Sequence, residues 1–307
     1  MTKILVTGGS GFVGNALLKH SSFSSALVIG RTKPSSDNDY VKISLDAATD
    51  YSVLLKGVDV IIHLAARAHV MDDKSNNPLE EFRFINTHAT LNLAAQAAKI
   101  GVKRFIFVST AKVLGEKTSQ SIRFTAFDSL CPQDPYSVSK AEAEMGLQKI
   151  AQESSMDLVI IRPPLVYGPE VKGNFEKLIR LISLKVPLPL KSINNRRSMV
   201  SVDNLVDLIA KCITAKNAEN QVFMVSDDHD LSTPELIRMI CLSKGINSKM
   251  FSFPPILLEL FLKCLGKGQV YERLCGSMQV DITYTKTQMK WEPITSPEKS
   301  FLMYFRK

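Results

Sequence analysis

The chain has 307 residues, of which 45% are hydrophobic and 22% charged, so it is neither a disordered nor a low-complexity chain. Its length suits one large domain or a large and a small one, and no internal repeat is present. The formal net charge is +8, but the basic residues are scattered and do not alternate with aromatic residues, which argues for a solvated surface rather than nucleic-acid binding.

Short apolar strands alternate with helical stretches through the first half of the chain. Strands are predicted at residues 4–6, 27–29, 41–45, 60–64, 105–109 and 158–162, and helices at 11–20, 78–100 and 135–153. Asn77-Pro78 and Asp134-Pro135 each place a capping residue before a proline, which marks two of the helix starts. This alternation predicts an α/β fold, a Rossmann-type doubly wound parallel sheet with right-handed crossovers.

The pattern loosens after about residue 165. Loops are predicted around Pro187, Pro189 and residues 192–198, helices at 203–215 and 233–243, and a strand at 221–225. We therefore expect a dinucleotide-binding domain over residues 1–165. Residues 166–307 should form a smaller, mixed α/β substrate-binding lobe, interleaved with the last strands of the sheet.

The longest apolar stretch, residues 253–265, contains Glu259 and Lys263 and is shorter than the roughly 20 residues that span a bilayer. A surface or interface helix is favoured over membrane anchoring, and no stable membrane insertion is expected. The five cysteines form no CxxC pair and no zinc-like cluster, so no metal site is expected. Because residues 1–7 already predict a strand, no targeting segment is expected before the fold, and the thiols should be reduced in the cytoplasm.

The first predicted strand runs into the loop Gly8-Gly9-Ser10-Gly11-Phe12-Val13-Gly14, which opens a helix. Gly8 would permit the tight turn, Gly11 the approach of a pyrophosphate to the backbone, and Gly14 the close packing of helix on strand. The free N–H groups and the dipole of the helix N-terminus favour phosphate. The loop therefore predicts a nicotinamide dinucleotide site, although a purely structural turn is the alternative.

The residue after the second predicted strand bears on the choice of cofactor. An acidic side chain there would hold the ribose 2′-hydroxyl, whereas an arginine suits a 2′-phosphate. Arg31 occupies this place, so NADP(H) is favoured and NAD(H) is the alternative.

Tyr136 and Lys140 form a Tyr-x-x-x-Lys pattern near the start of a predicted helix. A spacing of four puts both side chains on one helix face. Bringing a tyrosine pKa from about 10 to near 7 requires roughly 4 kcal/mol of phenolate stabilisation. We expect the lysine ammonium and a charged nicotinamide to supply it in a low-dielectric pocket. Tyr136 could then exchange a proton with a sugar oxygen as hydride moves at the carbon.

The G-x-x-G-x-x-G spacing, the Tyr-x-x-x-Lys pattern and a strand ending in Ser109-Thr110 together resemble the extended short-chain dehydrogenases/reductases, the NAD-dependent epimerase/dehydratase family. The resemblance covers nearly the whole chain and implies a nucleotide-sugar epimerase, dehydratase or reductase. It makes Thr110, Tyr136 and Lys140 catalytic: Thr110 would bind the reacting oxygen, and Lys140 would also bind the nicotinamide ribose.

The resemblance further implies which residues contact the cofactor. Asp46 would contact the adenine, although a capping role is the alternative. His63 begins an H-x-A-A segment and is expected to pack rather than to catalyse. Asn86 resembles a structural or cofactor-binding asparagine. The full cofactor set is Gly8, Ser10, Gly11, Phe12, Val13, Gly14, Arg31, Asp46, Leu64, Ala65, Ala66, Asn86, Ser109, Tyr136, Lys140 and Pro163.

On the substrate side, Thr110 and Tyr136 are joined by Asn174 and Arg197, which resemble residues that contact the diphosphate, and by Arg273, a weaker match. The planar guanidinium suits phosphate binding, and a surface arginine is the alternative for each. The sequence departs from the family's pattern at several places. Lys112 replaces a small residue, Leu114 a tyrosine and Ser198-Met199 an Asp-Tyr pair, while residues 251–277 match no epimerase pattern.

The first functional hypothesis is a 4-ketoreductase that uses NADPH to reduce a UDP-4-keto-6-deoxy-N-acetylhexosamine to a UDP-N-acetylquinovosamine-type sugar for surface polysaccharide. The alternative is a UDP-glucose or UDP-N-acetylglucosamine 4-epimerase that keeps NAD bound. A dehydratase is less expected, because Ala111 and Lys112 stand where an acidic pair is usual. A remote alternative is a non-catalytic cofactor-sensing regulator.

The expected partners are a UDP-linked sugar and, through the helices predicted at residues 78–100 and 135–153, a second copy of the chain. These helices resemble those that pair two subunits into a four-helix bundle in the family. A face buried within one chain would have the same sequence pattern.

Overall fold

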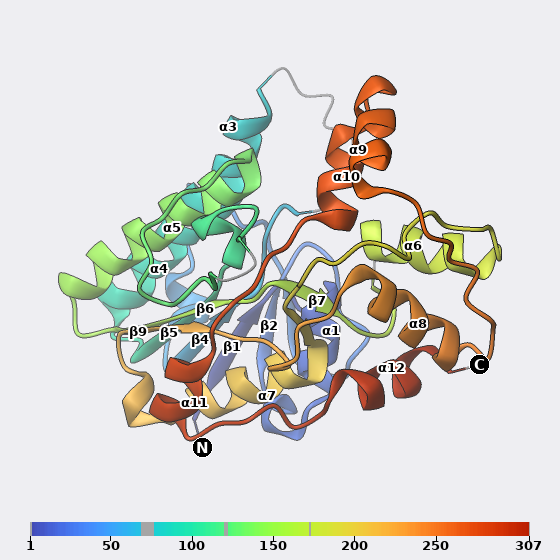
Figure 1. Cartoon of the computed structure of the whole chain (residues 1–307). Coiled ribbons are helices and arrows are strands. Elements are labelled where there is room, and N and C mark those ends of the chain that lie inside the picture. Colours follow the sequence, from blue (N-terminus) through green and yellow to red (C-terminus); the bar gives the residue numbers. More distant parts are fainter. Residues whose placement is uncertain (1, 69–76, 120–121, 172, 307) are drawn as a thin grey trace.

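The computed structural model describes residues 2–68, 77–119, 122–171 and 173–306. Its main sheet has seven strands in the order β3-β2-β1-β4-β5-β6-β9, and every neighbouring pair is parallel (Figure 1). The strands are β1 (Ile4–Thr7), β2 (Leu27–Gly30), β3 (Tyr40–Lys42), β4 (Val60–His63), β5 (Arg104–Val108), β6 (Asp157–Arg162) and β9 (Gln221–Met224). The predicted Rossmann-type α/β fold is confirmed.

Two helical layers cover this sheet because its strands are apolar on both faces. Ile4 and Val6 face a layer that contains α1 and α7, and Leu5 between them faces a layer that contains α2, α4 and α5. Figure 1 shows α4 and α5 side by side on one face and α7 across the other. The bounds are α1 (Phe12–Lys19), α2 (Ser52–Leu55), α4 (Thr90–Ile100), α5 (Pro135–Gln152) and α7 (Val202–Cys212).

The edge strand β3 is shorter than the predicted strand over residues 41–45. The last ladder bond runs from the Ile43 N–H to the Gly30 carbonyl, at 3.0 Å. Gly30 is the end of β2, so residues beyond Ile43 have no strand to pair with.

The helix predicted over residues 78–100 consists of α3 (Pro78–Arg83), a π-helical turn η2 (Phe84–Ala89) and α4. Asn77 caps α3, as predicted, by accepting from the Glu80 N–H. Asp134 caps α5 in a reciprocal capping box with Ser137, with 2.6 Å from the Ser137 N–H to the Asp134 carboxylate. The π-helical turn carries Asn86, and such turns are frequent at functional sites.

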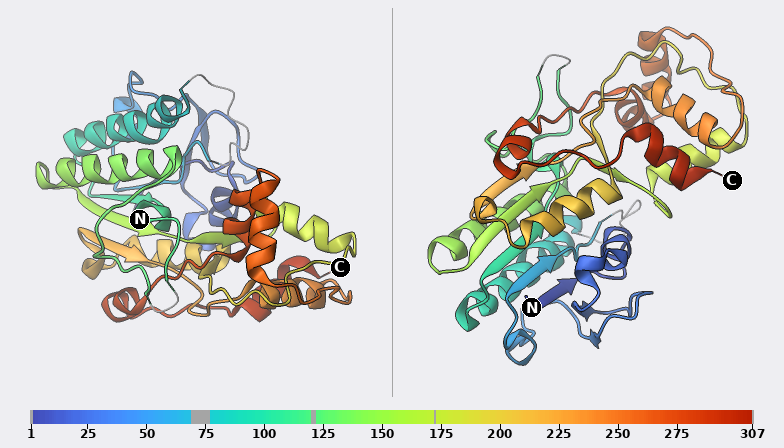
Figure 2. Two further views of the ribbon diagram at one scale, coloured as in Figure 1. Left: turned by 45° about the horizontal axis from the view of Figure 1, so that its top comes forward. Right: turned by 90° about the horizontal axis from the view of Figure 1, so that it is seen from below.

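The second half forms a mixed α/β lobe with its own apolar cluster, which includes Tyr167, Phe175 and Phe301. Figure 2 shows this lobe beside the sheet. Its elements are β7 (Leu165–Tyr167) paired with β8 (Met199–Ser201), and the helices α6 (Asn174–Ser183), α8 (Thr233–Ser243), α9 (Pro255–Cys264), α10 (Gly268–Cys275) and α12 (Pro297–Phe305). Three other elements of this half belong with the main sheet: β9 is its last strand, α7 covers one face, and α11 (Thr283–Met289) packs against β9. The boundary at residue 165 stays a prediction.

Three further observations bear on the sequence predictions. Within the described ranges no helix is long and apolar enough to cross a bilayer. Those residues also place no group of three or more His, Cys, Asp or Glu where it could hold a metal ion. All five cysteines are free thiols.

Candidate active site

The glycine loop leaves no room for side chains at two of its positions. Gly8 has a φ of +73°, and a Cβ there would lie 2.5 Å from the Ala65 nitrogen. A Cβ on Gly14 would lie 2.2 Å from the Gly8 carbonyl oxygen. The predicted roles of Gly8 in the turn and of Gly14 in helix packing therefore have a steric basis.

The N-terminus of α1 offers the groups that a dinucleotide diphosphate needs. Gly11 is the cap residue of α1, and no side-chain hydrogen bond caps the helix there. The Gly11 N–H itself is used by the Gly8 carbonyl, at 3.0 Å, so the following N–H groups of the first turn face outward from the loop. Ser10, Phe12 and Val13 lie in this loop and first turn. A Cβ on Gly168 would lie 3.1 Å from the Phe12 ring, so the Arg162–Pro169 segment runs against the loop.

The segment Leu64–Ala66 lies beside the glycine loop and is fixed by a buried histidine. His63 is 1% exposed, with Nδ1 2.9 Å from the Thr7 hydroxyl and Nε2 2.9 Å from the Thr90 hydroxyl. Burial, and to a lesser extent the nearby Lys140 charge, lower the pKa of His63 to about 3. The ring is therefore neutral near pH 7 and packs between strands, as the sequence indicates.

Asn86 is fully buried and holds the backbone that follows the Leu64–Ala66 segment. Its Oδ1 accepts from the Arg67 N–H at 2.8 Å, and its Nδ2 donates to the Arg67 carbonyl at 3.1 Å and to the Ser139 hydroxyl at 3.0 Å. Asn86 thus ties the loop after β4 to α5. This geometry makes it a positioning residue rather than a direct cofactor ligand.

The two residues expected near the adenosine half of the cofactor differ in what they do. Arg31 follows β2 directly and is exposed. It lies at the carboxyl-terminal ends of the parallel strands, which we call the sheet edge and where the glycine loop also lies. Asp46 accepts from the Ala48 and Thr49 N–H groups, at 2.9 and 2.8 Å, and from the Thr49 hydroxyl. These bonds, the Thr49 hydroxyl first, lower the pKa of Asp46. Asp46 therefore caps a turn, which is the alternative that the sequence left open.

Lys140 is buried at the end of β5, next to Ser109 and Thr110. Its Nζ donates to the Val108 carbonyl at 2.8 Å and lies 4.1 Å from the Phe107 ring centroid. Burial lowers the pKa of Lys140 to about 7, and the Glu144 carboxylate opposes that shift. Thr110 is 8% exposed, and the buried Ser109 Oγ has no hydrogen-bond partner among the residues that the structure describes.

The pKa of Tyr136 shifts in the opposite direction to the one expected from the sequence. Burial, and then the Asp134 carboxylate, raise the pKa of its phenol above the ordinary value. The expected lowering needs a cation beside the phenol, whereas the Lys140 ammonium is bonded to the Val108 carbonyl. The Tyr136 ring packs edge-on against Phe82, with 6.1 Å between centroids.

These residues fit a nicotinamide dinucleotide. The glycine turn and the uncapped start of α1 suit the diphosphate, and the unpartnered Ser109 Oγ and the Lys140 ammonium lie along the same edge. The backbone joins the neighbouring segments, because the Pro163 carbonyl accepts from the Ala111 N–H at 2.8 Å. In the family, the oxidised nicotinamide ring carries the positive charge that is missing beside the Tyr136 phenol.

Two ion pairs around α5 were not predicted from the sequence. Lys112 lies 2.5 Å from the Asp134 carboxylate that caps α5. Burial alone would raise the pKa of Asp134, but Lys112 and the Ser137 N–H bring it below its ordinary value. In the second pair, Nε and Nη2 of Arg162 donate to the Glu144 carboxylate oxygens at 2.6 to 3.2 Å. Both side chains are at least 95% buried.

Glu144 follows Lys140 by one helical turn, so the second pair anchors the face of α5 that carries Tyr136 and Lys140. Arg162 also donates to the Ala126 carbonyl at 3.2 Å. The sequence shows that Glu144 lies four residues after Lys140, but it does not reveal that Glu144 pairs with Arg162 on β6.

Arg197 lies two residues before β8, and its side chain reaches the C-terminal end of α10 in the second lobe. Its Nη1 donates to the Arg273 and Gly276 carbonyls, at 2.8 and 3.2 Å. Burial lowers the pKa of this guanidinium, and in the part of the chain that the structure describes no carboxylate pairs with it. The Arg273 side chain is exposed and donates to Gln269 instead. Asn174 is the first residue of α6, and its side chain lies outside the described atoms.

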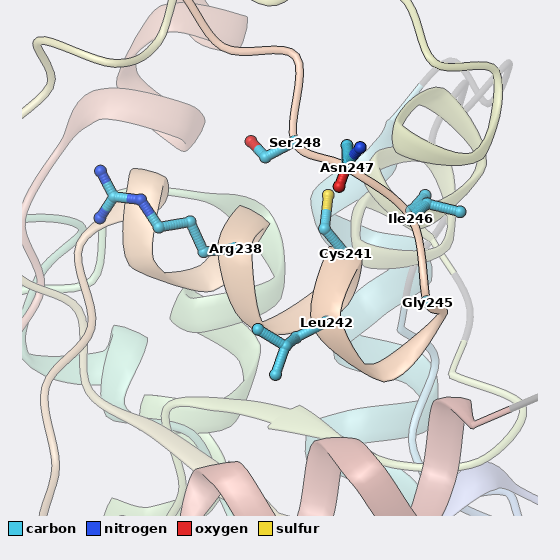
Figure 3. A pocket seen from close by; sticks show the side chains of 7 residues that line it. All are labelled: Arg238, Cys241, Leu242, Gly245, Ile246, Asn247 and Ser248. Atoms are coloured by element: carbon cyan, nitrogen blue, oxygen red, sulfur yellow. The ribbon is translucent and has the colours of Figure 1, made fainter.

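A surface hollow lies apart from these residues. It is found at the C-terminal end of α8 and is lined by residues 238, 241–242 and 245–248 (Figure 3). Arg238 extends away from the loop that carries Asn247 and Ser248. The residues that line the hollow include no acid–base cluster, whereas the sheet edge carries Thr110, Tyr136 and Lys140.

The comparisons with known proteins identify the family of the chain. Residues 4–226 match the model of the NAD dependent epimerase/dehydratase family. The chain is 44% identical to a UDP-glucose 4-epimerase of Vibrio cholerae over 304 residues, covering 97% of this chain and 93% of that protein. The chain therefore belongs to the NAD-dependent epimerase/dehydratase family, as its motifs indicated.

Solved structures share the fold at lower identity. MoeE5 bound to UDP-glucose and NAD superposes with a TM-score of 0.78 at 19% identity, covering 99% of this chain and 97% of that one. The UDP-glucose 4-epimerase of Thermotoga maritima gives a TM-score of 0.78 at 20% identity, with the same coverage. These likenesses establish the extended short-chain dehydrogenase/reductase fold.

Proposed function

We propose that this chain is a 4-epimerase of a UDP-linked hexose or N-acetylhexosamine that keeps NAD bound. The observation that carries the proposal is the 44% identity to a UDP-glucose 4-epimerase across 97% of the chain. The sheet edge supports it, because Thr110, Tyr136 and Lys140 gather beside a loop that suits a dinucleotide. The comparisons thus favour the alternative of the sequence analysis over its first hypothesis, the 4-ketoreductase.

In this proposal the sugar C4 hydroxyl lies between Thr110 and Tyr136. A bound nicotinamide would supply the hydride chemistry at C4, oxidation of the alcohol and then reduction of the keto-sugar on the opposite face after it has turned. Tyr136 takes the hydroxyl proton during oxidation and gives it back during reduction. Thr110 holds the oxygen, while Lys140, fixed to the Val108 carbonyl on the same helix face as Tyr136, is available to bind the nicotinamide ribose. Asn86, Glu144 and Arg162 hold the backbone and the helix that present these groups.

Arg197 is proposed to bind the diphosphate of the UDP-sugar. Its side chain is half-buried, carries no ion pair among the described residues, and has one nitrogen engaged with carbonyl groups. A diphosphate would supply the negative charge that this arginine lacks, in the bidentate geometry that guanidinium groups favour.

A second candidate is the 4-ketoreductase with NADPH. The exposed Arg31 at the end of β2 favours it, since a 2′-phosphate needs a cation at that place. Arg31→Asp separates the two readings: a site built for NADP(H) would lose at least about tenfold of its NADPH affinity relative to NADH. An unchanged ratio of the two dissociation constants argues against the reductase.

The direct experiment incubates the purified chain with UDP-glucose, UDP-N-acetylglucosamine and UDP-4-keto-6-deoxy-N-acetylglucosamine. Conversion of a saturated UDP-sugar to its C4 epimer without net change in NADH or NADPH is the expected result. Stoichiometric NADPH oxidation with the keto-sugar alone would instead establish the reductase.

Homodimer formation through α4 and α5 stays a prediction. Met145 on α5 is 53% exposed, which leaves apolar surface on this helix pair. Sedimentation velocity of the wild type and of Met145→Glu tests it, with a dimer that dissociates on substitution as the expected result.

A further inference from the structure

The helix α9 carries a broad apolar face that the described part of the chain leaves exposed. Of its ten residues only Leu258 is buried. The outward side shows Ile256 at 79% exposure, Leu260 at 59% and Phe261 at 60%. Leu257 and Leu265, both more than half exposed, extend the same face. Figures 1 and 2 show α9 and α10 standing out from the second lobe.

These side chains form one stripe rather than a scatter. Residues 256, 257, 260, 261, 264 and 265 recur at the spacing of one helix face, and Leu258 and Leu262 occupy the opposite side. Single exposed apolar residues are ordinary on protein surfaces, but a contiguous stripe of this kind marks a contact site. The ordinary polar outer face of a surface helix is missing here.

The charges around α9 indicate what covers it. Residues 244–273 contain five basic and only two acidic side chains. Both acids are neutralised by lysines: Glu259 pairs with Lys263 at 2.6 Å, and Glu272 approaches Lys117 at 3.9 Å. Lys267 is exposed just beyond the C-terminal end of α9, and Lys249 is exposed in the segment that leads into the helix. An apolar helix face with a basic rim is complementary to a bilayer whose headgroups are anionic.

We propose that the α9–α10 projection docks this enzyme on the surface of an anionic lipid bilayer, with the apolar face of α9 lying in the headgroup region. The helix has ten residues and cannot span the hydrocarbon core. Docking is therefore peripheral and reversible, and the basic side chains remain at headgroup level. The inference is independent of which sugar reaction the sheet edge performs.

Co-sedimentation with vesicles tests the proposal directly. The intact chain should bind vesicles of phosphatidylethanolamine and phosphatidylglycerol and bind pure phosphatidylcholine vesicles much more weakly. Leu260→Asp with Phe261→Asp should abolish binding, whereas Leu302→Asp with Met303→Asp, at equally exposed positions on α12, should leave it unchanged. Lys249→Glu with Lys267→Glu should weaken binding at least about fivefold, and more at low salt.

A fluorescent label provides a readout that misfolding cannot imitate. Cys264 is exposed in the middle of the stripe, and Cys131 is exposed elsewhere. An environment-sensitive dye on Cys264, with Cys131→Ser, should shift to the blue on adding anionic vesicles. The same dye on Cys131, with Cys264→Ser, should not shift.

Two results would overturn the proposal. One is the absence of binding and of a dye shift with the folded wild-type chain. The other is a lipid-free dimer that Phe261→Asp converts to monomer, because the stripe would then be covered by a second copy of the chain.

Discussion

The half of the chain that forms most of the main sheet, here called the sheet half, differs from the second lobe in one property. The two regions differ in whether their charged and apolar side chains have partners within the chain. In the sheet half the buried Lys140, Glu144 and Arg162 each have a partner within the chain. In the second lobe the half-buried Arg197 has no acidic partner among the described residues, and α9 presents an apolar face that those residues leave exposed. The buried charges of the first region are therefore satisfied within the chain, whereas those two features of the second lobe are the ones for which we propose ligands outside the chain.

The largest expected effect concerns the reacting group of the sheet half. Tyr136→Phe removes the proton carrier but little volume, so turnover should fall by roughly 10²–10⁴-fold. Cofactor affinity should change little, because the glycine loop is intact, and a fluorescence titration with NADH checks it. Turnover that persists at the wild-type rate would show that another group carries the proton.

The next effect is on stability and contrasts two ion pairs of the same helix. Glu144→Gln breaks a fully buried pair and should cost about 3–5 kcal/mol of unfolding free energy. Glu142→Gln breaks the partly exposed pair with Arg83 and should cost about 0–1 kcal/mol. Denaturant titration measures both. Equal losses would mean that the Glu144–Arg162 pair does not anchor α5.

In the second lobe, Arg197→Ala should raise the KM for the UDP-sugar by about 10–100-fold with a smaller effect on kcat. The reason is the lost charge-assisted contact to the diphosphate. Arg273→Ala is the matched control, since its side chain is exposed and bonded to Gln269. If both variants keep the wild-type KM, the diphosphate binds elsewhere.

The smallest effect depends on pH. Lys140 has a pKa lowered to about 7 by burial, so between about pH 7 and its ordinary value the unfolded chain binds one more proton than the folded one. Its burial therefore costs most stability at and below pH 7, and that cost shrinks as the pH rises. Lys140→Met should raise Tm relative to the wild type at pH 6.5, with the difference declining towards pH 9.5. A difference that grows with pH would contradict the buried, weakly basic lysine.

The sequence predicted the sheet half well because its signals are local. Strands such as β4 and β5 are apolar on both faces, and the caps Asn77 and Asp134 mark helix starts by themselves. The glycine spacing and the Tyr136–Lys140 pair each lie within a single loop or helix. Their physical meaning could therefore be inferred without knowing the partner strands.

The remaining features depend on contacts between distant segments. The pairs Lys112–Asp134 and Glu144–Arg162 join residues whose partners no local pattern reveals. The parallel pair β7–β8 is three residues long and closes over a separation of more than thirty residues. The helix α6 is different, since Phe175, Leu178 and Ile182 repeat at helical spacing and could have predicted it.

The most direct test of the account uses a UDP-sugar that carries deuterium at C4. If the chain is a 4-epimerase with a retained cofactor, the C4 epimer forms with deuterium still at C4 and with no net NADH or NADPH consumed. Loss of the deuterium to solvent, or product that appears only with stoichiometric NADPH oxidation, would contradict it.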